Sequence, residues 1–230
     1  MTRKTVAVYG GAFNPVHNGH MALATHIVMD GLADQVIFLP SFNPPHKDGS
    51  TFESFDRRCE MLELAFKDTY DAPNTCMMGD EFEVCTLERE LDGITYTLRV
   101  LDELSHRWLD KDFKMVIGAD ELAQLHTWRP DPIRLVRSYD FLCFPREDVP
   151  LDLTEMNKHW PGWLCKKLLD GIIFDAPMLG VSSSAVRKTI QEQGWCPLSA
   201  KVPESVRNYI NGNSLYMEGY KNGNERPSGA

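Results

Sequence analysis

The chain has 230 residues, with 24 lysines and arginines against 33 aspartates and glutamates, so its formal net charge at pH 7 is −9. This length suits one full α/β domain, and a hydrophobic content of 43% is ordinary for a globular protein. The acidic balance disfavours a nucleic-acid binder, which needs a basic face. No run approaches the roughly 20 apolar residues of a membrane span, and no secretion signal opens the chain, so we expect a cytoplasmic protein without a membrane partner.

Cysteine spacing narrows the function further. The six cysteines stand at positions 59, 76, 85, 143, 165 and 196, and none belongs to a CxxC pair. In a chain without a secretion signal, this spacing predicts reduced and mostly buried thiols. A metal or redox protein built on Cys and His is therefore disfavoured.

Short apolar runs alternate with amphipathic helical patterns along the chain. The predicted strands are Thr5–Tyr9, Val36–Leu39, a polar-interrupted stretch near Cys76–Val84, Phe113–Ile117, Phe141–Phe144 and Ile172–Phe174. The predicted helices are His20–Met29, Phe55–Phe66, Thr95–Trp108 with Thr95 or Thr97 as its cap, and Val181–Gln193. Strands that alternate with helices of this length predict an α/β fold with a Rossmann-like, doubly wound parallel sheet.

We expect a single domain over residues 1–216 that closes with a C-terminal helical segment. Residues 146–170 are more irregular and predict a helical excursion. Residues 217–230 are rich in Gly, Asn and Ser, and this composition predicts a disordered tail.

The most informative segment is Thr5–His20, TVAVYGGAFNPVHNGH, in which a β-branched apolar run leads into two glycines and two histidines. Open α/β sheets bind nucleotides beyond the carboxyl end of the first strand, with the phosphates at a helix N-terminus. Gly10 and Gly11 would let backbone N–H groups approach an anion that a β-carbon would obstruct. His17 and His20 are three residues apart, so one helical turn can aim both at the same phosphates.

Five further segments follow predicted strands or begin predicted helices at the same end of such a sheet. They are Pro40–Lys47 with His46 and Lys47, Gly93–Thr97, Ile117–Arg129 with Asp120 and Trp128, Phe144–Arg146, and Val181–Arg187. Taken alone, each is also explained as a solvated turn, a helix cap or, for Trp128, a core residue. Helix N-termini suit phosphates, Arg187 can chelate phosphate oxygens, and Asp120 suits ribose hydroxyls. Together, at one end of one sheet, they predict a nucleotide site.

In this order the motifs resemble the bacterial-type nicotinate-mononucleotide adenylyltransferases of the HxGH nucleotidyltransferase superfamily. GGAFNPVHNGH resembles the superfamily's first motif. The narrower likeness rests on PPHK at Pro44–Lys47, RCEMLELA at Arg58–Ala65, TYT at Thr95–Thr97, IGAD with its downstream HTW, VSSSAVR, and VPESVRNYINGNSLY at Val202–Tyr216. It extends from about Val6 to Tyr216. The resemblance implies adenylyl transfer from ATP to nicotinate mononucleotide (NaMN), which gives nicotinate adenine dinucleotide and pyrophosphate in NAD biosynthesis.

The resemblance also implies roles for single residues. The catalytic residues would be His17, His20 and Arg187. The ATP-binding residues would be Gly10, Gly11, Ala12, Phe13, His17, His20, Ser183, Ser184 and Arg187. On the mononucleotide, Lys47 would approach the phosphate, Asp120 would bind the ribose, Trp128 would stack on the pyridine ring, and Thr97 with the backbone N–H of Arg129 would read the ring carboxylate. Mg²⁺ would be carried into the site with ATP, because the sequence offers no dedicated carboxylate cage.

Several positions depart from the family's pattern. Ala12 replaces a usual Thr or Ser, Asn14 a frequent Asp and Arg99 a common Asp, while the segment from Glu90 to Thr95 is two residues longer. These departures leave the reaction class intact and weaken only the base preference. Arg129, beside the proposed stacking residue, favours a carboxylate over a neutral carboxamide.

Other functions stay open at this point. Nicotinamide mononucleotide could be the preferred or an additional acceptor, and a non-catalytic regulator could sense nucleotides without turnover. The intact histidine pair and Arg187 argue against the regulator. Transfer to phosphopantetheine is disfavoured, because enzymes of that kind that resemble this motif are much shorter. The sequence leaves the choice between a monomer and a homo-oligomer open.

Overall fold

The computed structural model describes residues 3–42, 52–73, 76–145, 153–177, 180–194, 198 and 201–217. Within these ranges five strands form one parallel sheet in the order β3-β2-β1-β4-β5. The strands are β1 (Lys4–Gly11), β2 (Gln35–Pro40), β3 (Phe82–Val84), β4 (Lys111–Gly118) and β5 (Asp140–Phe144). The strand order reverses beside β1, which confirms the predicted doubly wound sheet.

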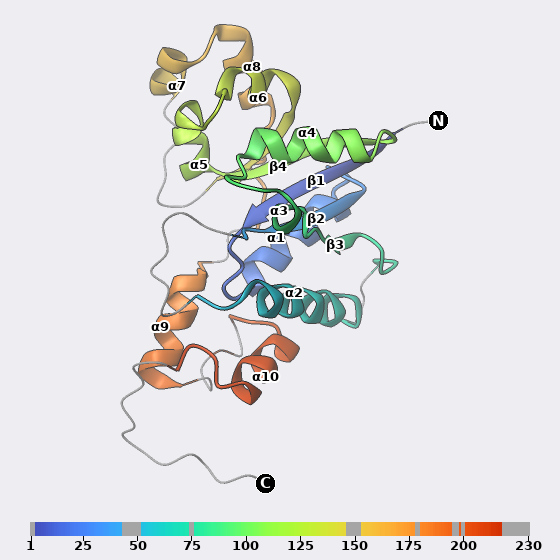
Figure 1. Ribbon diagram of the computed structural model, residues 1–230, viewed down its shortest axis with the longest axis vertical. Helices are drawn as coiled ribbons and strands as arrows, with labels where there is room; N and C mark the ends of the chain where they lie inside the picture. Colours follow the sequence, from blue (N-terminus) through green and yellow to red (C-terminus); the bar gives the residue numbers. More distant parts are fainter. Residues whose placement is uncertain are drawn as a thin grey trace.

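Helices cover both faces of this sheet (Figure 1). On one face lie α3 (Leu87–Glu90), α4 (Thr97–Arg107), α5 (Ala119–Gln124), the 3₁₀ turn η2 (Leu125–Thr127), α6 (Pro132–Ser138), α7 (Leu153–His159) and α8 (Gly162–Asp170). On the other lie α1 (Asn18–Met29), α2 (Phe55–Tyr70), α9 (Ser183–Gln193) and α10 (Glu204–Gly212). The predicted C-terminal helical segment therefore packs on the same face as α1.

Two cores result, because successive residues of a strand point to opposite faces. Val6 and Val8 of β1 join the core that contains α4, whereas Ala7 between them joins the core that contains α1 and α2. Every residue of β2 is buried. This two-sided burial explains why the strands have continuous apolar sequences instead of alternating ones.

Two predictions about elements were wrong. Ile172–Phe174 is not a strand: Ile172 forms one isolated bridge with Cys143, and Phe174 is 76% exposed, so the chain leaves the sheet edge at once. The cap of α4 is neither threonine but Tyr96, without a side-chain hydrogen bond. The physical reason is that the Thr95 hydroxyl donates to Glu88 instead, over 3.2 Å.

The predicted helical excursion contains α7 and α8, and residues 146–152 lie outside the described ranges. Of the predicted tail, Met217 alone is described, so its disorder stays a prediction. In the ranges that the structure covers, each helix is too short or too polar to cross a membrane.

Candidate active site

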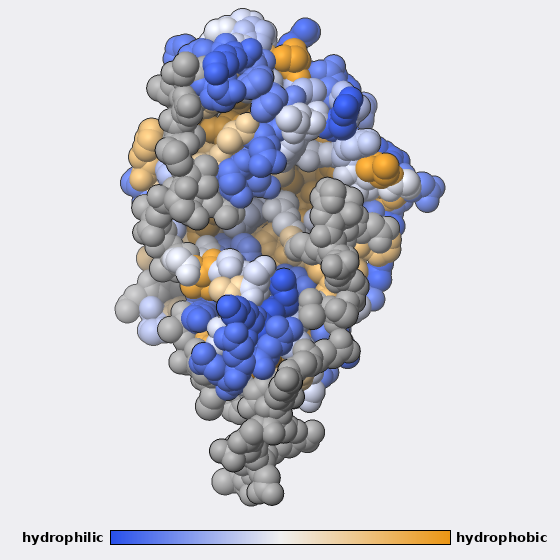
Figure 2. Space-filling model, turned by 90° about the vertical axis from the view of Figure 1, so that its left-hand side faces the viewer, coloured by the Kyte–Doolittle hydropathy of each residue, from blue (hydrophilic) through white to orange (hydrophobic). Residues whose placement is uncertain are grey.

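A cavity of about 770 Å³ opens at the carboxyl edge of the sheet, beside the reversal of strand order. Figure 2 looks onto this edge and shows a hollow across the middle of the face, with hydrophilic surface above and below it. Its wall is formed by the ends of β1, β4 and β5, the first turn of α1 and the segment before α9. The predicted site residues that line it are Gly10, Gly11, His17, His20, Asp120 and Ser183.

Gly10 and Gly11 line the cavity at the end of β1, where each packs closely against a neighbouring side chain. A β-carbon on Gly10 would lie 3.3 Å from the Met115 side chain, and one on Gly11 would lie 3.0 Å from the Phe13 ring. Phe13 itself is 1% exposed and adopts a left-handed backbone with φ 46°. Its ring meets the rings of Tyr9 and His20 edge-on, at centroid distances of 5.6 and 5.0 Å. The Phe13 side chain therefore supports His20, which leaves only its backbone for the predicted phosphate cradle.

His17 and His20 cap the N-terminus of α1 reciprocally. The His20 N–H donates to Nδ1 of His17 over 3.3 Å, and the His17 N–H donates to Nδ1 of His20 over 3.2 Å. The two rings are stacked, with their centroids 3.6 Å apart. An Nδ1 atom that accepts a hydrogen bond carries no proton, so each neutral ring has its N–H at Nε2. The cap thereby prepares two parallel imidazole donors at a helix N-terminus, where an anion is favoured.

The first turn of α9 is anchored to the loop after β1. The Ser183 hydroxyl donates to the carbonyl of Pro15 over 2.8 Å, and Nη1 of Arg187 donates to the carbonyl of Asn14 over 2.7 Å. The Nη2 atom of Arg187 donates to the Ser184 hydroxyl over 3.3 Å. Ser183 lines the cavity, whereas Arg187 and Ser184 do not. Arg187 therefore contacts the backbone of the turn after β1 in this structure.

The predicted acceptor residues are only partly brought together. Asp120 lines the cavity from α5, whose N-cap is Gly118. Trp128 is half-buried against the core that contains α4, Thr97 is half-buried at the start of α4, and Arg129 is exposed. These three residues do not line the cavity. Lys47 lies outside the described residues, as does Arg146.

Two buried residues, to which the sequence assigned no role of their own, donate hydrogen bonds to the turn after β1. Arg58 of α2 is 1% exposed and donates to the carbonyl of Ala12. The Tyr216 hydroxyl, also buried, donates to Oδ1 of Asn14 over 2.9 Å, and burial raises the pKa of this phenol. The sequence feature that could have identified Arg58 is its position three residues before Met61, on the buried stripe of α2. An arginine buried there without partners would be costly, so its position indicates that it has partners.

Comparisons of this chain with known proteins assign its family. A sequence model described as cytidylyltransferase-like matches residues 8–189. The chain belongs to this family. A relative from Desulfotalea psychrophila, named a probable nicotinate-nucleotide adenylyltransferase, is 34% identical over 222 residues, which cover 93% of this chain and all of the relative. One of the same name from Neisseria meningitidis serogroup C is 32% identical over 93% of this chain and 98% of its own length.

Solved structures agree on the fold. The nicotinic acid mononucleotide adenylyltransferase of Plasmodium falciparum, solved in a complex with NaAD, superposes with a TM-score of 0.72 over 93% of this chain and 97% of its own, at 18% sequence identity. At this identity the likeness extends to the architecture only. The family therefore rests on the sequence model, and the superposition shows that the architecture is shared.

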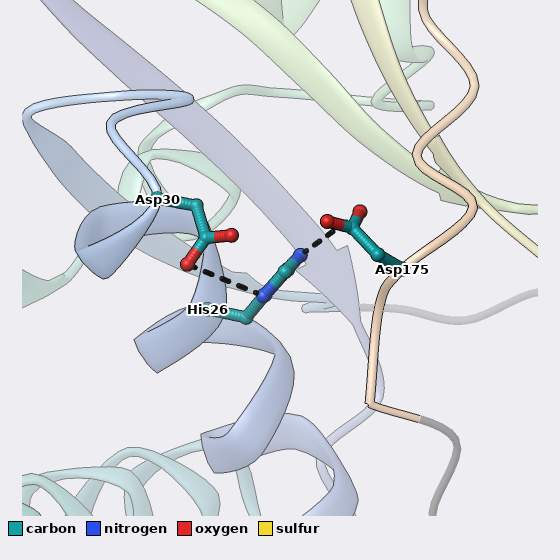
Figure 3. Close-up of side chains that lie close together, drawn as sticks. All are labelled: His26, Asp30 and Asp175. Carbon is teal, nitrogen blue, oxygen red and sulfur yellow. Dashed lines mark ion pairs between the residues drawn. The ribbon is translucent and has the colours of Figure 1, made fainter.

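One cluster of metal-ligand types lies beside the cavity. His26, Asp30 and Asp175 form the group of three such side chains found among the described residues. Figure 3 shows the imidazole between the two carboxylates, with Nδ1 3.6 Å from Asp30 and Nε2 3.8 Å from Asp175. Because each nitrogen faces a different carboxylate, the imidazole separates the two acids and does not converge with them on one ion. The side chain of His26 is 13% exposed.

Proposed function

We propose that this protein transfers the adenylyl group of ATP to NaMN and releases pyrophosphate, as a step of NAD biosynthesis. The observation that carries the proposal is the pair of reciprocally capped histidines at the N-terminus of α1, facing a cavity at the switch point of the sheet. Whole-length similarity to relatives named nicotinate-nucleotide adenylyltransferases supports the choice of acceptor.

In the proposed reaction, a phosphate oxygen of NaMN attacks the α-phosphorus of ATP in line, and the bond to the leaving pyrophosphate breaks. The attacking phosphate is already an anion, so no general base is needed. Catalysis then rests on positioning and on donors that stabilise the developing negative charge. His17 and His20 supply N–H donors at Nε2, and the α1 N-terminus adds its partial positive charge. Ser183 lines the same cavity from the first turn of α9.

Mg²⁺ would enter with the triphosphate. The carboxylates of the cavity wall are Asp120 and Glu121, and Glu121 already accepts the Gly118 N–H over 2.9 Å. Among the described residues, the single three-ligand cluster is the His26 group outside the cavity lining. The residues present therefore fit a Mg²⁺ that would be held mainly by the triphosphate and by water and not by a protein cage. Bound in this way, the ion would neutralise charge on the phosphates.

The acceptor side supports NaMN over its amide. Asp120 lines the cavity, which supports its proposed role as acceptor for ribose hydroxyls, and Arg129, next to Trp128, would add a positive charge on the side of the proposed ring pocket. Because Arg129 is exposed, solvent screens this charge and the preference is moderate. Nicotinamide mononucleotide therefore remains a second acceptor to be compared.

The test measures pyrophosphate release with ATP and Mg²⁺ and, in turn, NaMN, nicotinamide mononucleotide and phosphopantetheine. We expect the highest kcat/KM with NaMN and no release after EDTA treatment. A higher kcat/KM with another acceptor would replace NaMN by that acceptor. ATP binding in calorimetry without pyrophosphate from any acceptor would reject the enzyme and leave a nucleotide sensor.

A further inference from the structure

Arg58 ties together three loops that the sequence keeps apart. Its guanidinium donates from Nη1 to the carbonyl of Ala12 over 2.8 Å, from Nη2 to the carbonyl of Ser41 over 2.7 Å, and from Nε to the carbonyl of Glu53 over 3.1 Å. The side chain is 1% exposed, and its guanidinium carbon lies 4.5 Å from the centre of the Phe52 ring. All three guanidinium nitrogens are thus used on backbone carbonyls, in a fork that lysine cannot reproduce.

These carbonyls belong to the two halves of the proposed site. Ala12 lies in the turn after β1, which is the proposed site of the ATP phosphates, and Ser41 directly follows β2, on the acceptor side of the proposed site. Ser41 also donates its N–H to the carbonyl of Gly11 over 2.9 Å. Hydrogen bonds from Arg58 and from Ser41 therefore fix Ser41 relative to the turn after β1.

Glu88 of α3 extends this network toward the acceptor side alone. Its Oε2 atom accepts from the Phe42 N–H over 3.0 Å and from the Thr95 hydroxyl over 3.2 Å. Phe42 follows Ser41, and Thr95 precedes Thr97, the predicted reader of the ring carboxylate. Burial raises the pKa of Glu88, while the nearby positive charge of Arg58 opposes this shift. The buried Arg58 and the half-buried Glu88 thus both form hydrogen bonds with the backbone of Ser41 and Phe42, directly after β2.

We propose that Arg58 and Glu88 are a pair of positioning residues, in which Arg58 sets the donor and acceptor halves of the site relative to each other and Glu88 sets the acceptor half. The inference rests on the proposed adenylyl transfer. Neither side chain lines the cavity, so Arg58 acts through backbone carbonyls, and Glu88 acts through the Phe42 N–H and the Thr95 hydroxyl. Positioning of this kind has large effects, since a displacement of about 1 Å can cost on the order of 100-fold in rate.

The pair predicts a split in the kinetic constants. In Arg58→Lys, one nitrogen replaces three, so we expect the KM values for ATP and for NaMN both to rise and kcat to fall, with kcat/KM reduced about 10- to 100-fold for each substrate. In Glu88→Ala, we expect the KM for NaMN to rise about tenfold while the KM for ATP stays unchanged. Glu88→Gln should largely restore NaMN binding, because an amide oxygen can accept the same two hydrogen bonds.

Arg57→Lys is the matched control. Arg57 is the neighbouring residue on α2, is 44% exposed, and pairs with Glu53 over 2.9 Å. Its variant should keep all kinetic constants. Binding of NaMN and of a non-hydrolysable ATP analogue is measured by calorimetry beside the kinetics, and the melting temperature of each variant is recorded.

The outcomes separate the two claims. A wild-type protein that makes no dinucleotide rejects the proposed function. An active wild type together with an Arg58→Lys variant that loses only melting temperature, at unchanged constants per folded molecule, overturns the positioning role. If Arg58→Lys does not fold, the Glu88 variants decide: an acceptor-selective loss with rescue by Gln supports the pair, and an equal effect on both substrates, or none, overturns it.

Discussion

Replacing His20 separates catalysis from helix capping. His20 has two functions on two atoms: Nδ1 accepts the His17 N–H and caps α1, and Nε2 carries the N–H donor at the cavity. His20→Ala removes both, whereas His20→Gln removes the imidazole but keeps an oxygen that can accept the same backbone N–H, as in a usual capping box. The pair of variants therefore measures each function by itself.

The expected magnitudes follow from these contacts. Loss of one preorganised donor to a developing anion costs about 10²–10³ in kcat, which is roughly 3–4 kcal/mol of transition-state stabilisation at about 1.36 kcal/mol per tenfold change. Loss of a cap costs about 1 kcal/mol of stability, which lowers the melting temperature of a domain of this size by about 2–4 °C. We expect both variants to lose kcat alike, and His20→Ala alone to lose stability.

Pyrophosphate release at saturating ATP and NaMN gives kcat, and thermal unfolding gives stability. His106→Gln on α4, an exposed histidine outside the cavity, serves as the control and should leave both quantities unchanged. A His20→Gln variant with near-normal kcat would refute the donor role. A loss of kcat that follows the loss of stability would show that the histidine acts only as a cap.

Three further predictions address the C-terminus, a buried thiol and the acceptor. Tyr216→Phe removes the hydrogen bond to Asn14 and should lower the free energy of unfolding in urea by about 1 kcal/mol, and an unchanged value would show that this bond contributes nothing. Burial raises the pKa of Cys143 from its ordinary 9.0 to about 12, so the folded state retains a proton that the unfolded state releases. Stability should therefore fall as the pH rises above 9, less steeply in Cys143→Ala, in denaturant titrations between pH 8 and 11; equal slopes would contradict this linkage. Arg129→Ala should lower the preference for NaMN over nicotinamide mononucleotide about two- to fivefold in kcat/KM, and an unaltered ratio would remove Arg129 from specificity.

Local patterns predicted the elements that flank the first motif correctly. The run Thr5–Tyr9 is a buried strand, Gly10 and Gly11 end it, and α1 begins at Asn18, because each of these features depends on neighbours in the sequence. The caps were harder to predict. Histidine is not a usual capping residue, so the reciprocal cap of His17 and His20 appears only once the rings are placed.

Contacts between residues that lie far apart in the sequence were predicted less well. Arg187 donates to the carbonyl of Asn14, a contact that the sequence did not indicate, and its role at the phosphates stays a prediction. The Ile172–Phe174 run has the composition of a strand, yet Phe174 turns out to solvent, because composition does not say where a sheet edge ends. Lys47 stays a prediction, since it lies outside the described residues.

The sequence by itself determined the class of fold and the chemical groups at its centre. Alternating apolar runs and helical patterns require a two-sided parallel sheet, and a strand, two glycines and two histidines put donors at its carboxyl edge. Only the tertiary structure decided what holds that turn in place. Arg58, Tyr216 and Ser183 reach it from 46, 202 and 168 residues away. Hydrogen bonds over such separations depend on how the layers pack, which no local pattern encodes.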